Sequence, residues 1–217
     1  MEAFFRTHRY LVEHVNAPVR RTLMDEIDWS DRMIGIKGTR GIGKTTFLLQ
    51  YAKEHFDIQD RKCLYINMNN FYFQGHGIAD FAGEFCKRGG RVLLIDQVFK
   101  QPDWSKELRR CYDEFPYLKI VFTGSSVMRL KDENPELNGI VKSYNLRGFS
   151  FREFITFCVG SLSDALRMSA SQVYGALRSS GVLNDYIVPC YDVLHTFSKD
   201  YLVEELTEVL KERGALA

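Results

Sequence analysis

One stretch of this chain decides its fold: Met33-Ile34-Gly35-Ile36-Lys37-Gly38-Thr39-Arg40-Gly41-Ile42-Gly43-Lys44-Thr45. Its second part, Gly38–Thr45, fits the phosphate-binding pattern G-x-x-x-x-G-K-[ST] without a mismatch. In that pattern, glycines let the backbone wrap a phosphate so that successive N–H groups point at the anion. Lys44 places a cation on the β and γ phosphate oxygens, and the Thr45 hydroxyl reaches a magnesium ion. We call Gly38–Thr45 the phosphate loop.

The surroundings of the phosphate loop support this interpretation. Residues 33–36 predict a short buried strand before the loop, and residues 46–53 predict a helix after it. The phosphates would lie at the N-terminus of that helix, where unpaired N–H groups and the macrodipole favour negative charge. The sequence therefore predicts a nucleotide-binding site. Its expected binding residues are Gly38, Thr39, Arg40, Gly41, Ile42, Gly43, Lys44, Thr45 and Thr46.

A second motif lies downstream, where the four apolar residues 92–95 are followed by Asp96. An aspartate in this position lies where a buried strand reaches the carboxyl edge of its sheet, the edge at which open α/β sheets bind ligands. We expect Asp96 to bind magnesium through its water shell, opposite Thr45.

The residue after Asp96 is Gln97, where ATPases with this layout usually carry a glutamate that activates the attacking water. A glutamine can hydrogen-bond a water but cannot take its proton at neutral pH. We therefore expect slow hydrolysis with Gln97 at the catalytic position. Two explanations fit the sequence: natural loss of fast hydrolysis, or deliberate replacement of a glutamate to trap the triphosphate state.

The next apolar run, residues 118–123, predicts a strand that ends in Thr123-Gly124-Ser125-Ser126. We expect this strand between the one that precedes the phosphate loop and the one that carries Asp96. Its terminal hydroxyls would then face the γ-phosphate, and Thr123 or Ser125 would sense it. The alternative is a Ser/Gly turn that caps the following helix.

Composition narrows the classes of protein. The 217 residues include 29 basic and 28 acidic side chains, so the net charge of +1 gives no global support for nucleic-acid binding. The five cysteines are odd in number and widely spaced, which favours reduced thiols in the cytoplasm. No apolar run approaches the roughly 20 residues of a membrane span. Residues 1–15 carry charges among their aromatic residues and do not resemble a signal peptide.

The order of the expected elements indicates an α/β fold. Strands are expected over 33–36, 62–67, 91–95 and 118–123, and helices over 3–16, 19–26, 77–88 and 103–114. This alternation implies a central parallel sheet with helices on both faces. From Ser150 the pattern changes to successive helices, the first opening on a capping box from Ser150 to Glu153. We expect three parts: N-terminal helices over 1–30, a P-loop core over 31–149, and a helical lid or docking region over 150–217.

Several segments together resemble one family. They are Leu93 to Asp96, residues 102–108, Phe115-Pro116, residues 120–126 and residues 146–154. The chain is similar over residues 20–157 to the bacterial AAA-type P-loop ATPases, especially those of Bacteroides-like anaerobes. In those proteins a C-terminal winged-helix and nuclease-like domain usually follows the module. The resemblance implies an AAA (ASCE) type sheet order, ATP with Mg²⁺ as ligands, and assembly through neighbouring subunits.

The chain departs from the pattern of that family in two places. The family typically carries D-E-[IV]-H-K where this chain has Asp96-Gln97-Val98-Phe99-Lys100. One or two arginines usually lie between Leu137 and Tyr144, and this chain has Asn138-Gly139-Ile140 there. An arginine that contacts the γ-phosphate of a neighbour stabilises transition-state charge. Arg129, Arg147 and Arg152 remain as candidates for that contact, and we expect no nuclease-like domain before Ala217.

These features predict a Mg·ATP-binding AAA-type module that acts as a nucleotide-dependent switch between ATP and ADP states. The helical C-terminal region would dock a protein partner or another copy of the chain. The alternative is a non-catalytic interaction protein that keeps nucleotide as a structural ligand. A small-molecule kinase also uses a phosphate loop, but it needs an arginine-rich lid and an acceptor site, for which the sequence shows no cluster.

Overall fold

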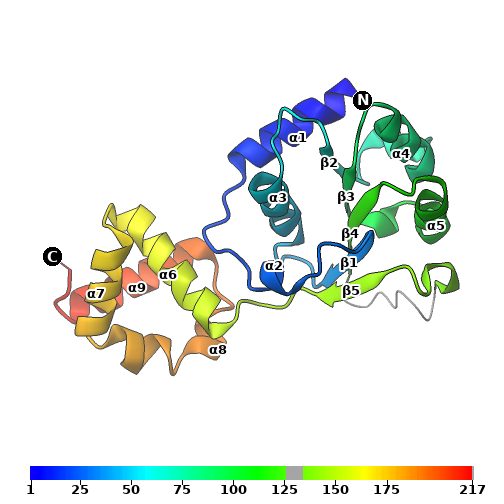
Figure 1. Ribbon diagram of the computed structural model, residues 1–217. Helices are drawn as coiled ribbons and strands as arrows, with labels where there is room; N and C mark the ends of the chain where they lie inside the picture. The colour runs from blue at the N-terminus through cyan, green and yellow to red at the C-terminus, as the bar shows by residue number, and fades with distance from the viewer. Residues whose placement is uncertain (126–133, 217) are drawn as a thin grey trace. The chain divides into compact units, whose positions relative to one another are not determined.

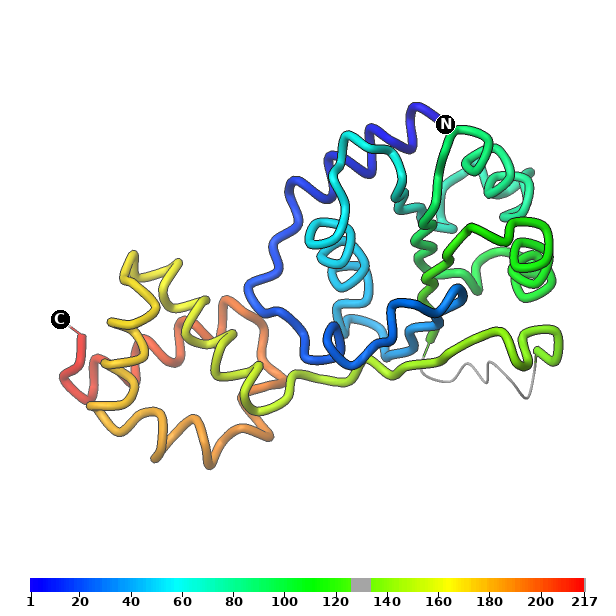
Figure 2. Tube along the Cα trace, in the orientation of Figure 1, coloured from blue at the N-terminus to red at the C-terminus, as the bar shows by residue number. Residues whose placement is uncertain are grey.

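The computed structural model describes residues 1–125 and 134–216, and the chain divides into two compact units. The first unit comprises Met1–Ala17 and Leu23–Gly148, and the second comprises Pro18–Thr22 and Phe149–Ala217. The chain thus enters the second unit at Pro18, leaves it at Leu23 and enters it again at Phe149, a path that can be followed in Figure 2. The N-terminal segment is therefore shared between the two units.

The first unit is built on a five-stranded sheet in the order β2-β3-β4-β1-β5. Its strands are β1 (Met33–Gly38), β2 (Cys63–Asn67), β3 (Val92–Asp96), β4 (Lys119–Ser125) and β5 (Lys142–Asn145). All four strand pairs are parallel. Strands β1 to β4 are short apolar runs buried on both faces, as the residues of a covered parallel sheet should be. The expected parallel sheet is confirmed, and β4 does lie between β1 and β3.

Helices cover both faces of this sheet. In Figure 1, α1 and α3 lie on one face, and α4 and α5 lie on the other. The helices of this unit are α1 (Glu2–His14), α2 (Leu23–Glu26), α3 (Lys44–His55), α4 (Ile78–Lys87) and α5 (Trp104–Glu114), with short 3₁₀ turns η1 (Phe71–Gln74), η2 (Val98–Lys100) and η3 (Pro135–Leu137). Each face has its own apolar core, and α1 contributes Phe5 to one core and Val12 to the other.

Two sequence expectations were wrong in this unit. The expected helix over 19–26 is reduced to α2, because residues 18–22 belong to the second unit and are not helical. Strand β5 was not expected at all. Its sequence, Lys-Ser-Tyr-Asn, is polar and mostly exposed, so it lacks the apolar pattern that marks the other strands.

A buried histidine ties α1 to the sheet. The Nδ1 atom of His8 accepts a hydrogen bond of 3.1 Å from the backbone N–H of Tyr65 in β2. Burial lowers the pKa of His8 from 6.5 to about 4, because the charged imidazolium would lose its hydration. The neutral ring is therefore the form that belongs to the folded protein.

We expect this histidine to make the first unit sensitive to mild acid. Its folded pKa is depressed, so its contribution to stability is present above pH 6.5 and is lost as the pH falls from 6.5 towards about 4. The shift corresponds to about 3 kcal/mol of unfolding free energy.

Denaturant unfolding at pH 7.5 and pH 4.5 measures this effect. The loss of unfolding free energy between the two pH values should be smaller for His8→Gln, which does not titrate, than for the parent chain. His14→Gln, at an exposed position of the same helix, should leave the loss unchanged. Equal losses in all three proteins would contradict this assignment.

The second unit is helical. It contains α6 (Phe151–Leu166), α7 (Ala170–Ser179), the π-helical turn η4 (Leu183–Ile187), α8 (Tyr191–Leu194) and α9 (Lys199–Glu212), packed around a core of its own. The capping box expected at Ser150 and Glu153 is confirmed, because the Ser150 hydroxyl accepts from the Glu153 N–H while the Glu153 carboxylate accepts from the Ser150 N–H. Helix α6 therefore begins where the sequence predicts.

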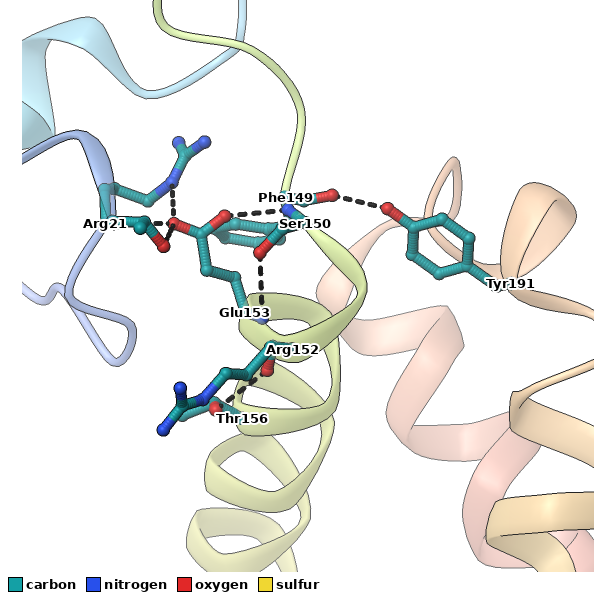
Figure 3. A network of polar contacts seen from close by, with 8 residues as sticks. Arg21, Phe149, Ser150, Arg152, Glu153, Thr156 and Tyr191 are labelled. Atoms are coloured by element: carbon teal, nitrogen blue, oxygen red, sulfur yellow. Dashed lines mark hydrogen bonds and ion pairs between the residues drawn. The ribbon is translucent and has the colours of Figure 1, made fainter. Parts of the chain in front are cut away.

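The same glutamate anchors the N-terminal segment to the second unit, as Figure 3 shows. Glu153 Oε1 accepts from the Thr22 N–H at 2.7 Å and from Arg21 Nε at 3.3 Å, and the Arg21 guanidinium also lies over the Phe149 ring. Burial alone would raise the pKa of Glu153, but the N–H groups of Thr22 and Ser150 and the charge of Arg21 outweigh it, and the pKa is lowered. Glu153 is thus held as a carboxylate that joins residues 18–22 to α6.

Candidate nucleotide-binding site

The phosphate loop joins β1 directly to α3. Gly43 has φ +90°, a left-handed conformation that favours glycine, and it precedes the first helical residue, Lys44. A side chain at Gly38 would have its Cβ 2.7 Å from the carbonyl oxygen of Leu146, so only glycine fits there. Two glycines of the motif are thus required by the fold: Gly43 by its own dihedral angle, and Gly38 by the close approach of Leu146 from a distant part of the chain.

The other expected binding residues lie along the same turn. Thr39, Arg40 and Gly41 are exposed, whereas Ile42 packs partly against the core around α3. Thr46 lies in the first turn of α3 and is half-buried. The N-cap residue of α3, Gly43, makes no side-chain capping hydrogen bond, so the first N–H groups of the helix have no acceptor from an N-cap side chain. This is the arrangement in which helix N-termini bind anions.

The Lys44 ammonium bends back onto its own loop. Its Nζ atom donates to the carbonyl oxygens of Gly38 and Thr39, each at 2.7 Å. Burial lowers the pKa of Lys44, and the negative charge of Asp96 opposes that effect. The cation is therefore held at the loop by main-chain oxygens.

The two motifs meet at Asp96. The Thr45 hydroxyl donates to Asp96 Oδ2 at 2.6 Å, although the two residues are 51 positions apart in the chain. Asp96 is almost completely buried at the end of β3, where its carboxylate receives further hydrogen bonds. The Thr123 hydroxyl donates to Oδ1 at 2.5 Å, and the side chains of Tyr65 and Asn67 donate to Oδ2 at 2.9 and 3.2 Å. The carboxylate is thus held by four side-chain donors from three elements, α3, β2 and β4.

Gln97 has a backbone conformation that is uncommon for a non-glycine residue, with φ 57° and ψ 46°. Its N–H donates to the Thr123 hydroxyl at 2.9 Å. Thr123 is fully buried, and its hydroxyl therefore links the backbone of Gln97 to the carboxylate of Asp96. The Gln97 side chain itself is half-buried at the carboxyl edge of the sheet.

The remaining candidates lie on other segments of the chain. Ser125 is the last residue of β4 and pairs in register with Gly38, which places it beside the start of the phosphate loop. Arg147 is exposed after β5, and Arg152 lies on α6 in the second unit. Arg129 lies outside the described residues.

Tyr65 and Asn67 are site residues that the sequence analysis missed. Both come from β2, a strand recognised only by its apolar pattern. Burial, followed by the charge of Asp96, raises the pKa of Tyr65 far above its ordinary value, so its hydroxyl remains a donor. The sequence did contain a signal for Asn67, because it is a polar residue at the end of a buried strand, and such ends lie at the ligand-binding edge of the sheet.

The residues of this site fit a magnesium nucleotide. A hydroxyl and a carboxylate, those of Thr45 and Asp96, are the hard oxygen groups that Mg²⁺ prefers. Among the described residues, no group of three or more His, Cys, Asp or Glu side chains could hold a metal ion. A magnesium ion here would therefore depend on phosphate oxygens and waters as well, which is usual for nucleotide sites.

All five cysteines are free, and no described helix is long and apolar enough to cross a bilayer.

Family models match both parts of the chain. The family model described as AAA domain matches residues 30–155, and one described as a protein of unknown function (DUF3791) matches residues 153–213. No curated protein matches the chain. A solved structure of C. elegans PCH-2 is 14% identical, with a TM-score of 0.45, over 98% of this chain and 66% of that one. This chain thus covers less than two thirds of that protein.

Proposed function

The chain belongs to the AAA domain family, and on that premise we propose that it binds ATP with magnesium and acts as a nucleotide-dependent switch. The observation that carries the proposal is the 2.6 Å hydrogen bond between Thr45 and Asp96, which brings the phosphate loop and the end of β3 to one point. The preference for adenine rests on the resemblance to bacterial AAA-type ATPases. The free, widely spaced cysteines support a location in the cytoplasm.

The chain's own residues have distinct tasks in this proposal. The phosphate loop N–H groups and Lys44 bind the phosphates, and residues Gly38 to Thr46 form the contact. Thr45 and Asp96 hold the metal, which when bound would supply charge neutralisation at the β and γ phosphates. Thr123 orients Asp96, and Ser125, beside the loop, senses the γ-phosphate. Gln97 orients a water without taking its proton, so hydrolysis is slow.

We propose that the helical region over 150–217 is the part of the chain that responds to the bound nucleotide. Residues 18–22 belong to the same unit as this region, and they are joined to α6 by Glu153. The first unit therefore connects to the helical unit through both the segment before β1 and the segment after β5. We propose that a protein partner or another copy of the chain docks on this region, in a manner set by the bound nucleotide.

The second candidate is an interaction protein that keeps nucleotide as a structural ligand. It is favoured by Gln97 and by the hydrogen bonds that already satisfy Asp96. Hydrogen exchange of α6 to α9, measured with Mg·ATP and with Mg·ADP at saturation, separates the two functions. A switch requires different protection in the two states, because a ligand that binds both conformations equally shifts nothing. Equal protection would establish the structural role instead.

A further inference from the structure

The Asp96 carboxylate has more donors on one oxygen than on the other. Oδ2 receives the hydroxyls of Thr45 and Tyr65 and the amide of Asn67. Within the part of the chain that the structure describes, Oδ1 receives the hydroxyl of Thr123. A carboxylate oxygen offers about two lone pairs, so Oδ2 is fully occupied. The carboxylate is therefore held through both of its oxygens. Three of the donors, Tyr65, Asn67 and Thr123, belong to neither motif, and the first two were not expected from the sequence.

Tyr65 is fixed at both of its ends. The residue is 5% exposed, and its backbone N–H donates to the Nδ1 atom of His8 in α1. A phenol buried in this way has little freedom other than its hydroxyl rotation, and the hydroxyl lies 2.9 Å from Asp96 Oδ2. The hydrogen bond is therefore built into the sheet and does not depend on a mobile side chain.

Asn67 is oriented by a second bond. Its Oδ1 atom accepts from the backbone N–H of Asn69 at 2.8 Å, which assigns the NH₂ group to the opposite side. There Nδ2 lies 3.2 Å from Asp96 Oδ2 and 3.4 Å from the Tyr65 hydroxyl. The parallel register explains the placement, because Asn67 pairs with Asp96 in adjacent strands. Both donors thus come from the last residues of β2.

We propose that Tyr65 and Asn67 are positioning residues of the metal site, which hold Asp96 in the orientation that magnesium requires. This inference rests on the proposed function. The two side chains contact the carboxylate and not the reacting atoms, so they act on the metal through Asp96. Hydrogen-bond partners of metal-binding carboxylates characteristically tune metal affinity in this way, with losses of about 10- to 100-fold when they are removed.

The test is the magnesium dependence of nucleotide binding by the full chain with Tyr65→Phe. ATP affinity is measured by calorimetry with Mg²⁺ and with EDTA, and the ratio of the two affinities isolates the metal's contribution. We expect Tyr65→Phe to reduce this ratio about 10-fold. The affinity in EDTA should be unchanged, because the phosphate loop is intact. A purely structural defect would lower both affinities and leave the ratio unchanged.

Two further variants make the test specific. Tyr51→Phe removes the hydroxyl of another buried tyrosine, one on α3 that has no hydrogen bond to Asp96, and it should keep the parent ratio. Asn67→Ala should reduce the ratio in the same direction, and it keeps the test decisive if Tyr65→Phe folds poorly. Free Mn²⁺, measured by its electron paramagnetic resonance signal in the presence of ATP, reports the metal directly. The signal should rise in both variants and not in Tyr51→Phe.

The outcomes separate this inference from the proposed function. An unchanged ratio in both Tyr65→Phe and Asn67→Ala, in a parent chain that binds Mg·ATP, would overturn the positioning role alone. An increased ratio would also overturn it, since it would mean that the two donors compete with the metal for Asp96. A parent chain that binds no ATP would overturn the proposed function itself.

Discussion

Gln97→Glu should raise the rate of single-turnover ATP hydrolysis about 100-fold or more. A positioned general base contributes roughly 10²- to 10⁴-fold to a proton-transfer step, and a glutamine cannot supply this contribution. The backbone at Gln97 is anchored by its N–H bond to the Thr123 hydroxyl, which is itself bonded to Asp96. The side chain of a glutamate at position 97 would therefore extend from an anchored backbone next to Asp96, the proposed metal ligand.

Gln101→Glu is the matched control for this gain. Gln101 follows η2, only a few residues downstream, and its Nε2 atom donates to the His76 carbonyl away from Asp96. This variant adds the same charge without placing a carboxylate next to Asp96. ATP affinity is measured alongside the rate, so that a change in binding is not taken for a change in chemistry. Equal hydrolysis rates in the two variants would show that the hydrolytic machinery is lost at more positions than Gln97. Residues 138–140 would then be the next to substitute.

The parts of this fold that the sequence predicts are those with a local signal. Strands β1 to β4 are continuous apolar runs, and the phosphate loop needs glycine at Gly43 because of that residue's own left-handed backbone conformation. The capping box at Ser150 is equally local. Each of these features can be recognised without knowing what packs against it, because the physical cause lies in the neighbouring sequence.

The parts that could not be predicted depend on pairing between distant segments. Asn67 reaches Asp96 only because β2 lies beside β3 in one particular register, and a shift of one residue would turn its side chain to the other face. Tyr65 looks like an ordinary aromatic residue of a buried strand, and its hydroxyl bond to Asp96 becomes visible only in the folded chain. The assignment of residues 18–22 to the helical unit likewise depends on Glu153, 131 residues beyond Thr22.

Lys44→Met should weaken ATP binding about 100-fold and leave the stability of the nucleotide-free chain unchanged. Hydrogen bonds to charged groups contribute about 1.5–3 kcal/mol each, and a cation between two phosphates would make more than one of them. In the structure, which holds no nucleotide, the Lys44 ammonium donates to the carbonyl oxygens of Gly38 and Thr39. Water can take over both carbonyls at this partly exposed loop, so the folded state loses little when the lysine is removed.

The measurement for Lys44→Met is the rise in melting temperature that Mg·ATP produces. A ligand that binds only the folded state stabilises it by RT ln(1 + [L]/Kd), so a 100-fold weaker affinity removes most of the rise at moderate nucleotide concentration. Lys53→Met, at an exposed position in the last turn of the same helix, should retain the parent's rise. If Lys44→Met melts earlier without nucleotide, the lysine is structural. If it keeps the rise with nucleotide, the phosphates do not lie at this loop, and the role proposed for Thr45 and Asp96 fails with it.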